Sequence, residues 1–390
     1  MLIFTLAARG AVSRRDAYFG PLAEWLGERA VLTVYLAAGA KVLLPGNPRL
    51  RPLESFANPL QVAAAWLESL APIGEFAAGN PEHAELAVRL ARDEALSGEV
   101  FMNAFLRRVF RSMLARVRPR VLVYPFENRP WEKALLTAAR EAGVERVVGY
   151  QHTSLTPRHL AIEMTSAVSM RTPLPDRLVT VGTVTAKWLA EKAPALADRI
   201  AVGASLRRSA QDLPLPAAPG ILAAISSSRD EALALMHLIH AVSGSIAVPV
   251  VIRSHPTIPV GDLFARFSWP PHVRLSVGAT LEADMADASM VLYSSSTVAL
   301  EGMLQGRLPL FADIGDLPAA DPLIGDCPAK SELASAEDLV ATVAAICRLG
   351  QAELESRRAA AKRYAKDYLR APGDAGIESI VAEILGEKRA

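Results

Sequence analysis

The residues best suited to chemistry are three serines that follow a short apolar segment, residues 290–293. The apolar segment is typical of a buried strand, and a helix is predicted from about Thr297. The first backbone N–H groups of a helix lack partners and attract an anion, and serine is short and donates its own hydroxyl. Glu301 would lie on the same helix face as Thr297, where it could accept hydrogen bonds from ribose hydroxyls. We therefore predict a nucleotide phosphate site at Ser294, Ser295 and Ser296, although serines at such junctions also serve as plain helix caps.

A histidine-proline pair follows another apolar run, residues 248–253. His255 would lie just past the end of this strand, at the carboxyl edge of the sheet where open α/β folds bind ligands. Pro256 disfavours a helical conformation at His255 and so directs the imidazole. A protonated imidazole would neutralise charge on a departing nucleotide phosphate, and Arg253 adds a permanent cation. A lone histidine is often structural, but the proline and the serine run favour a role in ligand binding.

A second serine-rich loop, residues 225–231, leads from a predicted strand into a helix. We expect Ser228 to line the same crevice and Arg229 to bind a phosphate or a sugar carboxylate. Asp230 or Glu231 could act as a base or nucleophile. The alternative is a capped helix whose first-turn acidic residues interact with the helix dipole.

Two turns of the first half of the chain end predicted strands with polar and aromatic residues. Their side chains would face the serine run across a cleft. A carboxylate held by neighbouring polar groups suits removal of a proton from an acceptor hydroxyl, or binding of the sugar. The alternative is that these loops close the domain and bind nothing. The residues concerned are Glu127, Asn128, Arg129, Gln151 and His152.

The histidine-proline pair and the serine run followed by Val-Ala-Leu-Glu resemble the motifs of bacterial sialyltransferases and Kdo transferases, which use CMP-activated acidic sugars. Residues 124–132 and 149–152 resemble a family of uncharacterised surface-carbohydrate biosynthesis proteins. The resemblance implies that His255 assists departure of the phosphate and that the serines hold CMP. The acidic motif that supplies the base in those enzymes is absent, so Asp230, Glu231 and Glu127 all stay candidates, and inverting or retaining chemistry stays open.

The function that this resemblance implies is a glycosyltransferase of bacterial surface polysaccharide biosynthesis (capsule, O-antigen or lipopolysaccharide). Its co-substrate would be a CMP-linked sugar nucleotide, with no other cofactor, and its acceptor a glycan or lipid-linked glycan. Similar features occur in transferases of teichoic-acid glycerol phosphate, so a CDP-glycerol or NDP-sugar donor is an alternative. A non-catalytic binding subunit with the same fold is an alternative of another class. No convincing Asp-x-Asp loop is present, so we expect transfer without a metal ion.

The elements that must position these residues form an α/β fold, because short β-branched runs alternate with longer amphipathic stretches. Residues 211–220 contain three prolines and a glycine and cannot form a helix or central strand. We expect two doubly wound Rossmann-like domains facing a central cleft, the GT-B arrangement. The predicted organisation is an acceptor-side domain at 1–212 with a helical insertion at about 58–117, a linker at 213–220, a nucleotide-sugar domain at 221–350, and helices at 351–390 that cross back to the first domain.

The predicted strands and helices have these ranges. Strands are expected at 2–7, 31–36, 120–124, 147–150 and 178–181 in the first domain, followed by a helix through Trp188. The second domain is expected to hold strands at 221–225, 248–253, 273–275, 290–293 and 308–311, and helices at 230–243, 280–287 and 297–305.

The composition argues against a nucleic-acid-binding protein and against an integral membrane protein. With 42 Lys and Arg against 41 Asp and Glu, the net charge is near zero, so no overall positive field would hold nucleic acid. No apolar run approaches the roughly 18–20 residues that span a bilayer. The two cysteines have no metal-ligand spacing, and the first residues lack a signal peptide pattern. We expect a cytoplasmic protein, and peripheral attachment to the inner membrane is compatible with this composition.

Overall fold

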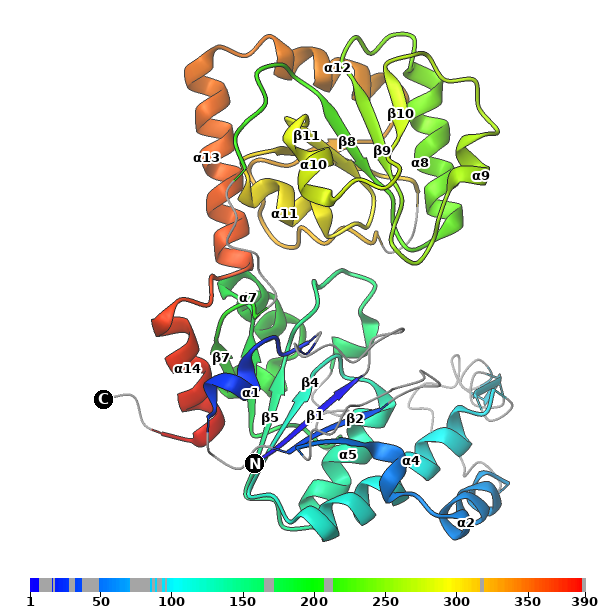
Figure 1. Ribbon diagram of the computed structural model, residues 1–390, viewed down its shortest axis with the longest axis vertical. Coiled ribbons are helices and arrows are strands. Elements are labelled where there is room, and N and C mark those ends of the chain that lie inside the picture. The colour runs from blue at the N-terminus through cyan, green and yellow to red at the C-terminus, as the bar shows by residue number, and fades with distance from the viewer. Residues whose placement is uncertain are drawn as a thin grey trace.

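The computed structural model places two parallel β-sheets in successive parts of the chain, each covered by helices (Figure 1). It describes residues 1–6, 16, 18–27, 32–36, 49–70, 85, 88, 89, 93, 94, 97–164, 172–206, 213–315 and 319–387. The first sheet has the order β3-β2-β1-β4-β5-β6-β7 and the second the order β10-β9-β8-β11-β12-β13. The fold class predicted from the sequence, two doubly wound Rossmann-like domains, is confirmed.

All described strand pairs are parallel, which places the carboxyl ends of each sheet's strands at one edge. The first sheet consists of β1 (Leu2–Leu6), β2 (Leu32–Leu36), β3 (Leu50–Pro52), β4 (Val121–Pro125), β5 (Arg146–Tyr150), β6 (Arg177–Thr180) and β7 (Ile200–Val202). The second consists of β8 (Ile221–Ala224), β9 (Val250–Arg253), β10 (Val273–Leu275), β11 (Met290–Tyr293), β12 (Leu308–Ala312) and β13 (Ser331–Leu333).

Central strands of the second sheet are buried along their whole length and those of the first sheet at all but one end residue, which explains their largely apolar sequences. All four residues of β8 and of β11 are buried, as are all five of β12. Because the strands are buried, their ends are fixed in position, and so are the polar residues that follow them at the carboxyl edge of the sheet.

Helices of the first domain pack on its sheet or on another helix. They are α1 (Leu22–Trp25), α2 (Pro59–Ser69), α4 (Glu99–Val117), α5 (Pro130–Glu141) and α7 (Thr183–Lys192), with 3-10 turns at Leu53–Phe56, Leu160–Ile162 and Pro194–Arg199. The predicted helical insertion at 58–117 contains α2 and α4, which pack against each other. Most of residues 71–96 lies outside the described part of the chain.

Helices of the second domain are α8 (Arg229–Val242), α9 (Gly261–Phe264), α10 (Leu281–Ala286), α11 (Val298–Leu304) and α12 (Ala336–Cys347). Side-chain caps define several starts. Ser228 accepts from the N–H of Glu231 at the start of α8, and Thr280 accepts from the N–H of Ala283 at the start of α10.

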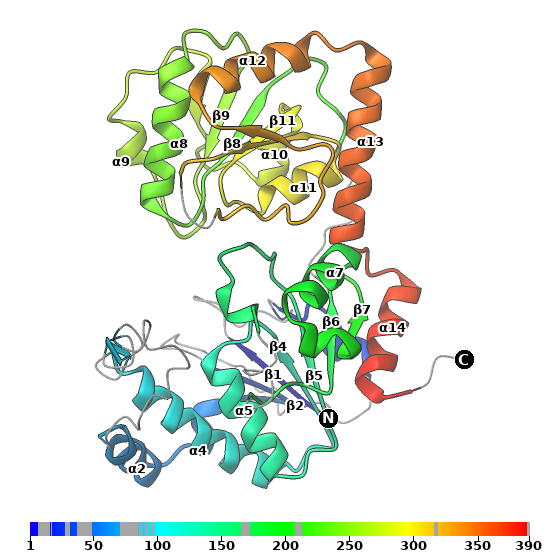
Figure 2. The same ribbon diagram turned by 180° about the vertical axis from the view of Figure 1, so that it is seen from behind.

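The last two helices, α13 (Gln351–Tyr368) and α14 (Asp374–Leu385), connect the second domain with the first (Figures 1 and 2). Helix α13 packs on α11 and α7, and α14 packs on β4, β5 and β6. The buried residues of α13 have the spacing of one helix face: Ala361, Tyr364, Ala365 and Tyr368. The Tyr368 hydroxyl accepts from the N–H of Leu155, 2.8 Å away in the first domain.

Close approach of backbones fixes this crossing. A Cβ atom on Gly182 would lie 2.2 Å from the carbonyl oxygens of both Asp367 and Tyr368. Only glycine lets the end of α13 lie against the start of α7.

Several short elements differ from the sequence predictions. Strands β3, β7 and β13 were not predicted, because three residues are too few to show a period-2 pattern. Strand β9 begins two residues later than predicted, after Pro249. Some predicted positions lie outside the described residues: Ala7 and Val31 of the predicted strands, residues 211–212 of the proline-rich segment, and residues 388–390 of the tail. In the described part of the chain, no helix combines the length and hydropathy that crossing a bilayer requires.

Candidate functional site

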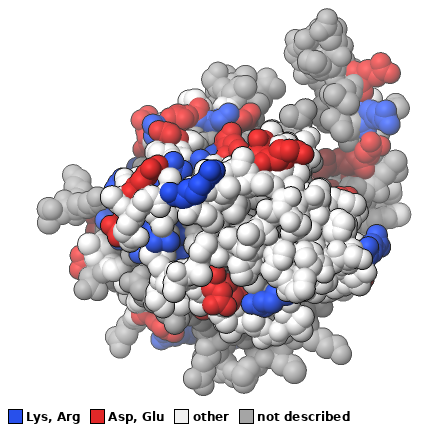
Figure 3. Space-filling view, turned by 90° about the horizontal axis from the view of Figure 1, so that it is seen from above, with Lys and Arg blue, Asp and Glu red and all other residues white. Residues whose placement is uncertain are grey.

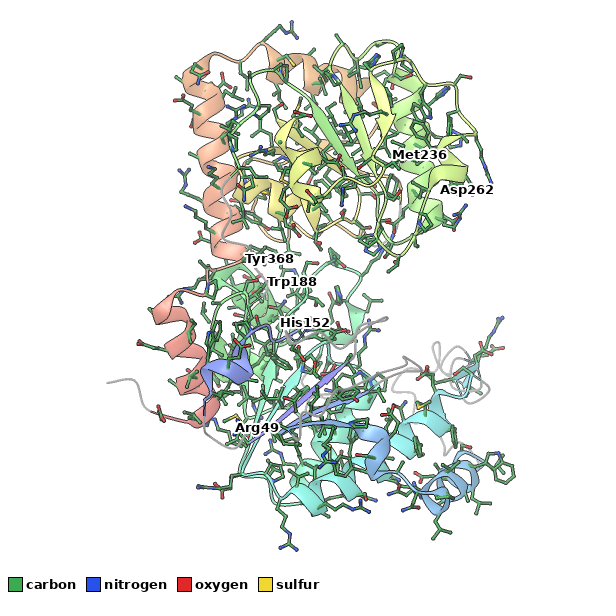
Figure 4. All side chains as sticks on the ribbon, in the orientation of Figure 1. Arg49, His152, Trp188, Met236, Asp262 and Tyr368 are labelled. Atoms are coloured by element: carbon green, nitrogen blue, oxygen red, sulfur yellow. The ribbon has the colours of Figure 1, made fainter. Side chains whose placement is uncertain are left out.

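A cavity of about 310 Å³ lies between the two domains. The second domain contributes one face of α11 and part of α10, including Thr297, Glu301 and Glu282. The first domain contributes the loop after β5, with His152, Thr153 and Ser154. Figure 4 shows His152 on the side of the first domain that faces the second. Three of the residues predicted from the sequence, Thr297, Glu301 and His152, therefore line one cavity.

The serine run lies where it was predicted, between β11 and α11, and its members do different things. Ser296 Oγ accepts from the N–H of Val298 at 3.4 Å, whereas Thr297, the N-cap residue of α11, makes no side-chain cap bond. Ser295 Oγ donates to Glu231 Oε2 at 2.5 Å. The Ser294 hydroxyl is buried and makes no hydrogen bond with a described residue.

Glu231 is the acidic residue of α8 that meets the serines. Its Oε1 lies 2.8 Å from Arg158 Nη1, so the ion pair joins the two domains. Burial raises the pKa of Glu231, but hydrogen bonds from Ser226, Ser295 and Arg158 outweigh it and leave the pKa below its ordinary value. The carboxylate therefore stays ionised in the cleft.

The other predicted residues of this loop lie elsewhere. Asp230 is exposed, one position before Glu231 and thus about 100° away around the helix, and no hydrogen bond or ion pair links its side chain to a described residue. Ser228 caps α8. Arg229 pairs with Asp262 at 2.5 Å, on the outer side of the second domain (Figure 4). The predicted contacts of Ser228 and Arg229 with a nucleotide thus compete with partners already present.

Arg253 and His255 also differ in their surroundings. Arg253 Nη1 lies 2.5 Å from Oδ2 of the buried Asp284 and 3.0 Å from the carbonyl oxygen of Ala279, so it holds α10 in place. His255 is half-buried, and its Nδ1 lies 2.8 Å from the Thr257 hydroxyl. Burial lowers the pKa of His255, which favours the neutral imidazole. His255 does not line the 310 Å³ cavity.

The first domain presents a carboxylate supported from two sides. Glu127 Oε1 lies 3.4 Å from Nε2 of the buried His152, and Glu127 Oε2 lies 3.3 Å from Arg129 Nε. The ring of Tyr18 packs edge-on against His152, with centroids 4.5 Å apart. The Glu127 side chain is 24% exposed, so it is fixed in direction and still open to solvent. It does not itself line the 310 Å³ cavity, but it contacts His152, which does.

A buried glutamate that was not predicted holds this loop. Glu132 accepts from the N–H groups of Glu127, Asn128 and Arg129 at 2.9–3.0 Å. Burial raises its pKa to about 8, although these backbone bonds lower it. Asn128 has a positive φ of 62° in this turn. Pro130 at the first helical position and Glu132 two residues later are the signal that could have identified this capped start.

Two predicted substrate contacts are occupied by the protein itself. The Asn128 amide donates to the Ala161 carbonyl oxygen and accepts from Lys133. Gln151 is fully buried, donates to the Thr153 carbonyl oxygen and accepts from the N–H of Val181. Both residues shape the loops that carry Glu127 and His152.

Charge on the surface is mixed. Seen from the end formed by the second domain, Lys and Arg lie beside Asp and Glu around a broad uncharged area (Figure 3). The face shown carries no continuous basic field of the kind that binds a nucleic acid backbone.

The whole architecture has known counterparts among solved structures. The calicheamicin glycosyltransferase CalG4 is 16% identical with a TM-score of 0.57, covering 100% of this chain and 99% of its own. The glycosyltransferase of kitacinnamycin is 14% identical with a TM-score of 0.54, covering 98% of each chain. UDP-N-acetylglucosamine 2-epimerase from Rickettsia bellii is 9% identical with a TM-score of 0.53, covering 99% of this chain and 96% of its own. No protein-family model and no curated protein matches the sequence. The chain thus has the GT-B fold, which glycosyltransferases share with these epimerases.

Proposed function

We propose that this protein is a glycosyltransferase that binds a nucleotide-activated sugar in the interdomain cavity and transfers the sugar to an acceptor hydroxyl. The observation that carries the proposal is the cavity itself. Thr297 and Glu301 line it from the second domain, and His152, in contact with Glu127, lines it from the first. On this proposal, the wall formed by α11 binds the donor and the loop after β5 faces the acceptor.

Glu127 is the proposed general base. The acceptor hydroxyl oxygen attacks the anomeric carbon, the bond from that carbon to the phosphate oxygen breaks, and its electron pair leaves with the nucleotide. The hydroxyl proton passes to Glu127. His152 and Arg129 hold the carboxylate from either side, which orients it before the substrate arrives. Glu301 is the proposed partner of the ribose hydroxyls.

The lining of the cavity favours a neutral sugar. The described lining residues include two carboxylates, Glu282 and Glu301, and neither Lys nor Arg. Arg229, predicted to bind a phosphate or a sugar carboxylate, pairs with Asp262. Arg253, predicted as a cation beside the phosphate, pairs with Asp284. An uncharged sugar needs no cation in this lining. The Rickettsia bellii epimerase of the same fold is named for a UDP-linked sugar, and on that ground we propose a nucleoside diphosphate sugar as the donor.

A CMP-linked acidic sugar is the second candidate donor, and the serine and histidine-proline motifs support it. Arg158, whose ion-pair partner Glu231 also accepts from Ser295, would then be the cation that faces the acidic group. In either case the acceptor proposed from the motif resemblance is a glycan or lipid-linked glycan of the bacterial surface, and transfer is expected to proceed when metal ions are chelated.

The test measures binding and transfer separately. CMP, CDP, UDP and GDP are titrated while thermal unfolding is followed, because a bound nucleotide raises the unfolding temperature. The matching sugar nucleotides are then assayed with glycan acceptors. Glu127→Gln should lose transfer by about 100-fold or more, the usual contribution of a general base, and keep nucleotide binding. His255→Ala measures the predicted assistance to phosphate departure and should likewise leave the fold intact.

Two results would contradict the proposal. Nucleotide binding without transfer to any acceptor would favour a non-catalytic binding subunit. Full transfer by Glu127→Gln would remove Glu127 as the base and leave Asp230 and Glu231 as candidates.

A further inference from the structure

The carboxylate of Glu231 accepts hydrogen bonds from three separate parts of the chain. Ser226 follows β8, Ser295 follows β11, and Arg158 comes from the other domain. Ser295 Oγ lies 2.5 Å from Oε2, and Arg158 Nη1 lies 2.8 Å from Oε1. Only 9% of the Glu231 side chain is exposed. A negatively charged group is thus enclosed where the two sheets' carboxyl edges meet.

These donors are the kind that bind phosphate. A guanidinium and two hydroxyls direct N–H and O–H groups at two oxygens of one anion, and arginine binds carboxylates and phosphates with the same geometry. The serines come from the loops that were predicted to hold a nucleotide phosphate. The protein's own carboxylate occupies the position that this prediction gives to the ligand.

The serine run also contains a buried hydroxyl that makes no hydrogen bond with a described residue. Ser294 is 4% exposed, and its Oγ has no hydrogen-bond partner among the described residues. Buried polar groups in native proteins are almost always paired, so the Ser294 hydroxyl is a further unused donor in the loop that carries Ser295.

We propose that Ser226, Ser295 and Arg158 form the binding site for a phosphate of the sugar nucleotide, and that Glu231 occupies this site until the donor displaces it. The inference rests on the proposed function. A phosphate cannot join Glu231 at these donors, because two negative charges about 4 Å apart repel strongly in a partly buried site. Donor binding therefore turns Glu231 away, breaks its ion pair with Arg158, and moves Arg158 to the phosphate.

The exchange would keep the two domains joined through Arg158 while the donor is bound. With Glu231 in place, Arg158 ties the two domains through a protein contact. With phosphate in place, the same arginine would tie them through the ligand, so that the cleft would be held in its reactive geometry when the donor is present.

The test uses inorganic phosphate, CMP and UDP as probes in titration calorimetry at fixed pH and salt. Glu231→Gln keeps the size of the side chain and removes its charge. We expect it to bind the probes about tenfold more tightly, which corresponds to a modest share of the repulsion between neighbouring like charges. Ser295→Ala should bind them about fivefold more weakly, because it lacks one donor. Glu337→Gln is the control, since Glu337 is an exposed first-turn residue of α12, a helix on the opposite side of the same domain from the cleft.

The outcomes separate this inference from the proposed function. Equal or weaker binding by Glu231→Gln, or no binding of any probe to either protein, would overturn the displacement model whether or not sugar transfer is detected. Tighter phosphate binding by Glu231→Gln in a protein that transfers no sugar would support the phosphate site and contradict the transferase. A gain in the Glu337→Gln control as large as in Glu231→Gln would show a general charge effect and also overturn the model.

Discussion

Replacing Gly182 by alanine should loosen the joint between the domains. The added Cβ would lie 2.2 Å from the carbonyl oxygens of Asp367 and Tyr368. An ordinary contact needs more than 3 Å, so the end of α13 must move by about 1 Å. Backbone atoms form the obstacle, and a rotamer change cannot relieve it.

The cost can be worked from the structure. Overpacking of this kind costs about 1–3 kcal/mol, and we expect the upper end because Tyr368 is buried and bonded to the Leu155 N–H at 2.8 Å. Urea unfolding would measure the loss of free energy. Hydrogen exchange at the Leu155 amide would show whether the bond to Tyr368 is broken.

Gly244→Ala is the matched control, because no atom lies within 4 Å of a Cβ at Gly244. If Gly182→Ala unfolds at the same urea concentration as Gly244→Ala and keeps its Leu155 amide protected, the close approach does not hold the joint.

Two further variants test the buried charges on either side of the cleft. Burial raises the pKa of Glu132 from 4.5 to about 8, so the folded protein keeps a proton that the unfolded chain has lost. The free energy of unfolding should therefore fall as pH rises from about 4.5 to 8. This pH-dependent loss should vanish in Glu132→Gln when unfolding free energies are compared across pH. A Glu132→Gln profile parallel to the wild type would contradict it. Arg253→Ala leaves the buried Asp284 carboxylate without its charge partner, although the Ser276 hydroxyl still donates to it, and should cost about 3 kcal/mol in denaturant unfolding. Unchanged stability with lost nucleotide affinity would return Arg253 to the phosphate-binding role predicted from the sequence.

The central sheets were accessible to prediction because each inner strand is a continuous apolar run. The strands β8 and β11 were predicted within one residue of their observed bounds. Edge strands of three residues carry no such pattern. Their place depends on hydrogen bonds to a neighbour far along the chain, as β13 depends on β12.

The candidate site was predictable in its loops and less so in its pairings. Ser295 was expected at the sheet edge, but its bond to Glu231 spans 64 positions. The spacing of Ser228 and Glu231 matches an N-cap and its third helical residue, which could have favoured Glu231 over Asp230. No neighbouring sequence pattern indicates that Arg158 belongs to the site. It lies in a polar turn and contacts Glu231 only after both domains have folded.

The return of the chain to its first domain has a consequence for biosynthesis. Helix α14 packs on β4, β5 and β6, and Glu383 binds Arg146 and Arg177 of that sheet. The second sheet is complete once residue 333 has left the ribosome, whereas the first sheet must wait for the final turns of the chain to cover it. We therefore expect the later-encoded half to reach its native state first, leaving the earlier half dependent on chaperones in the interval.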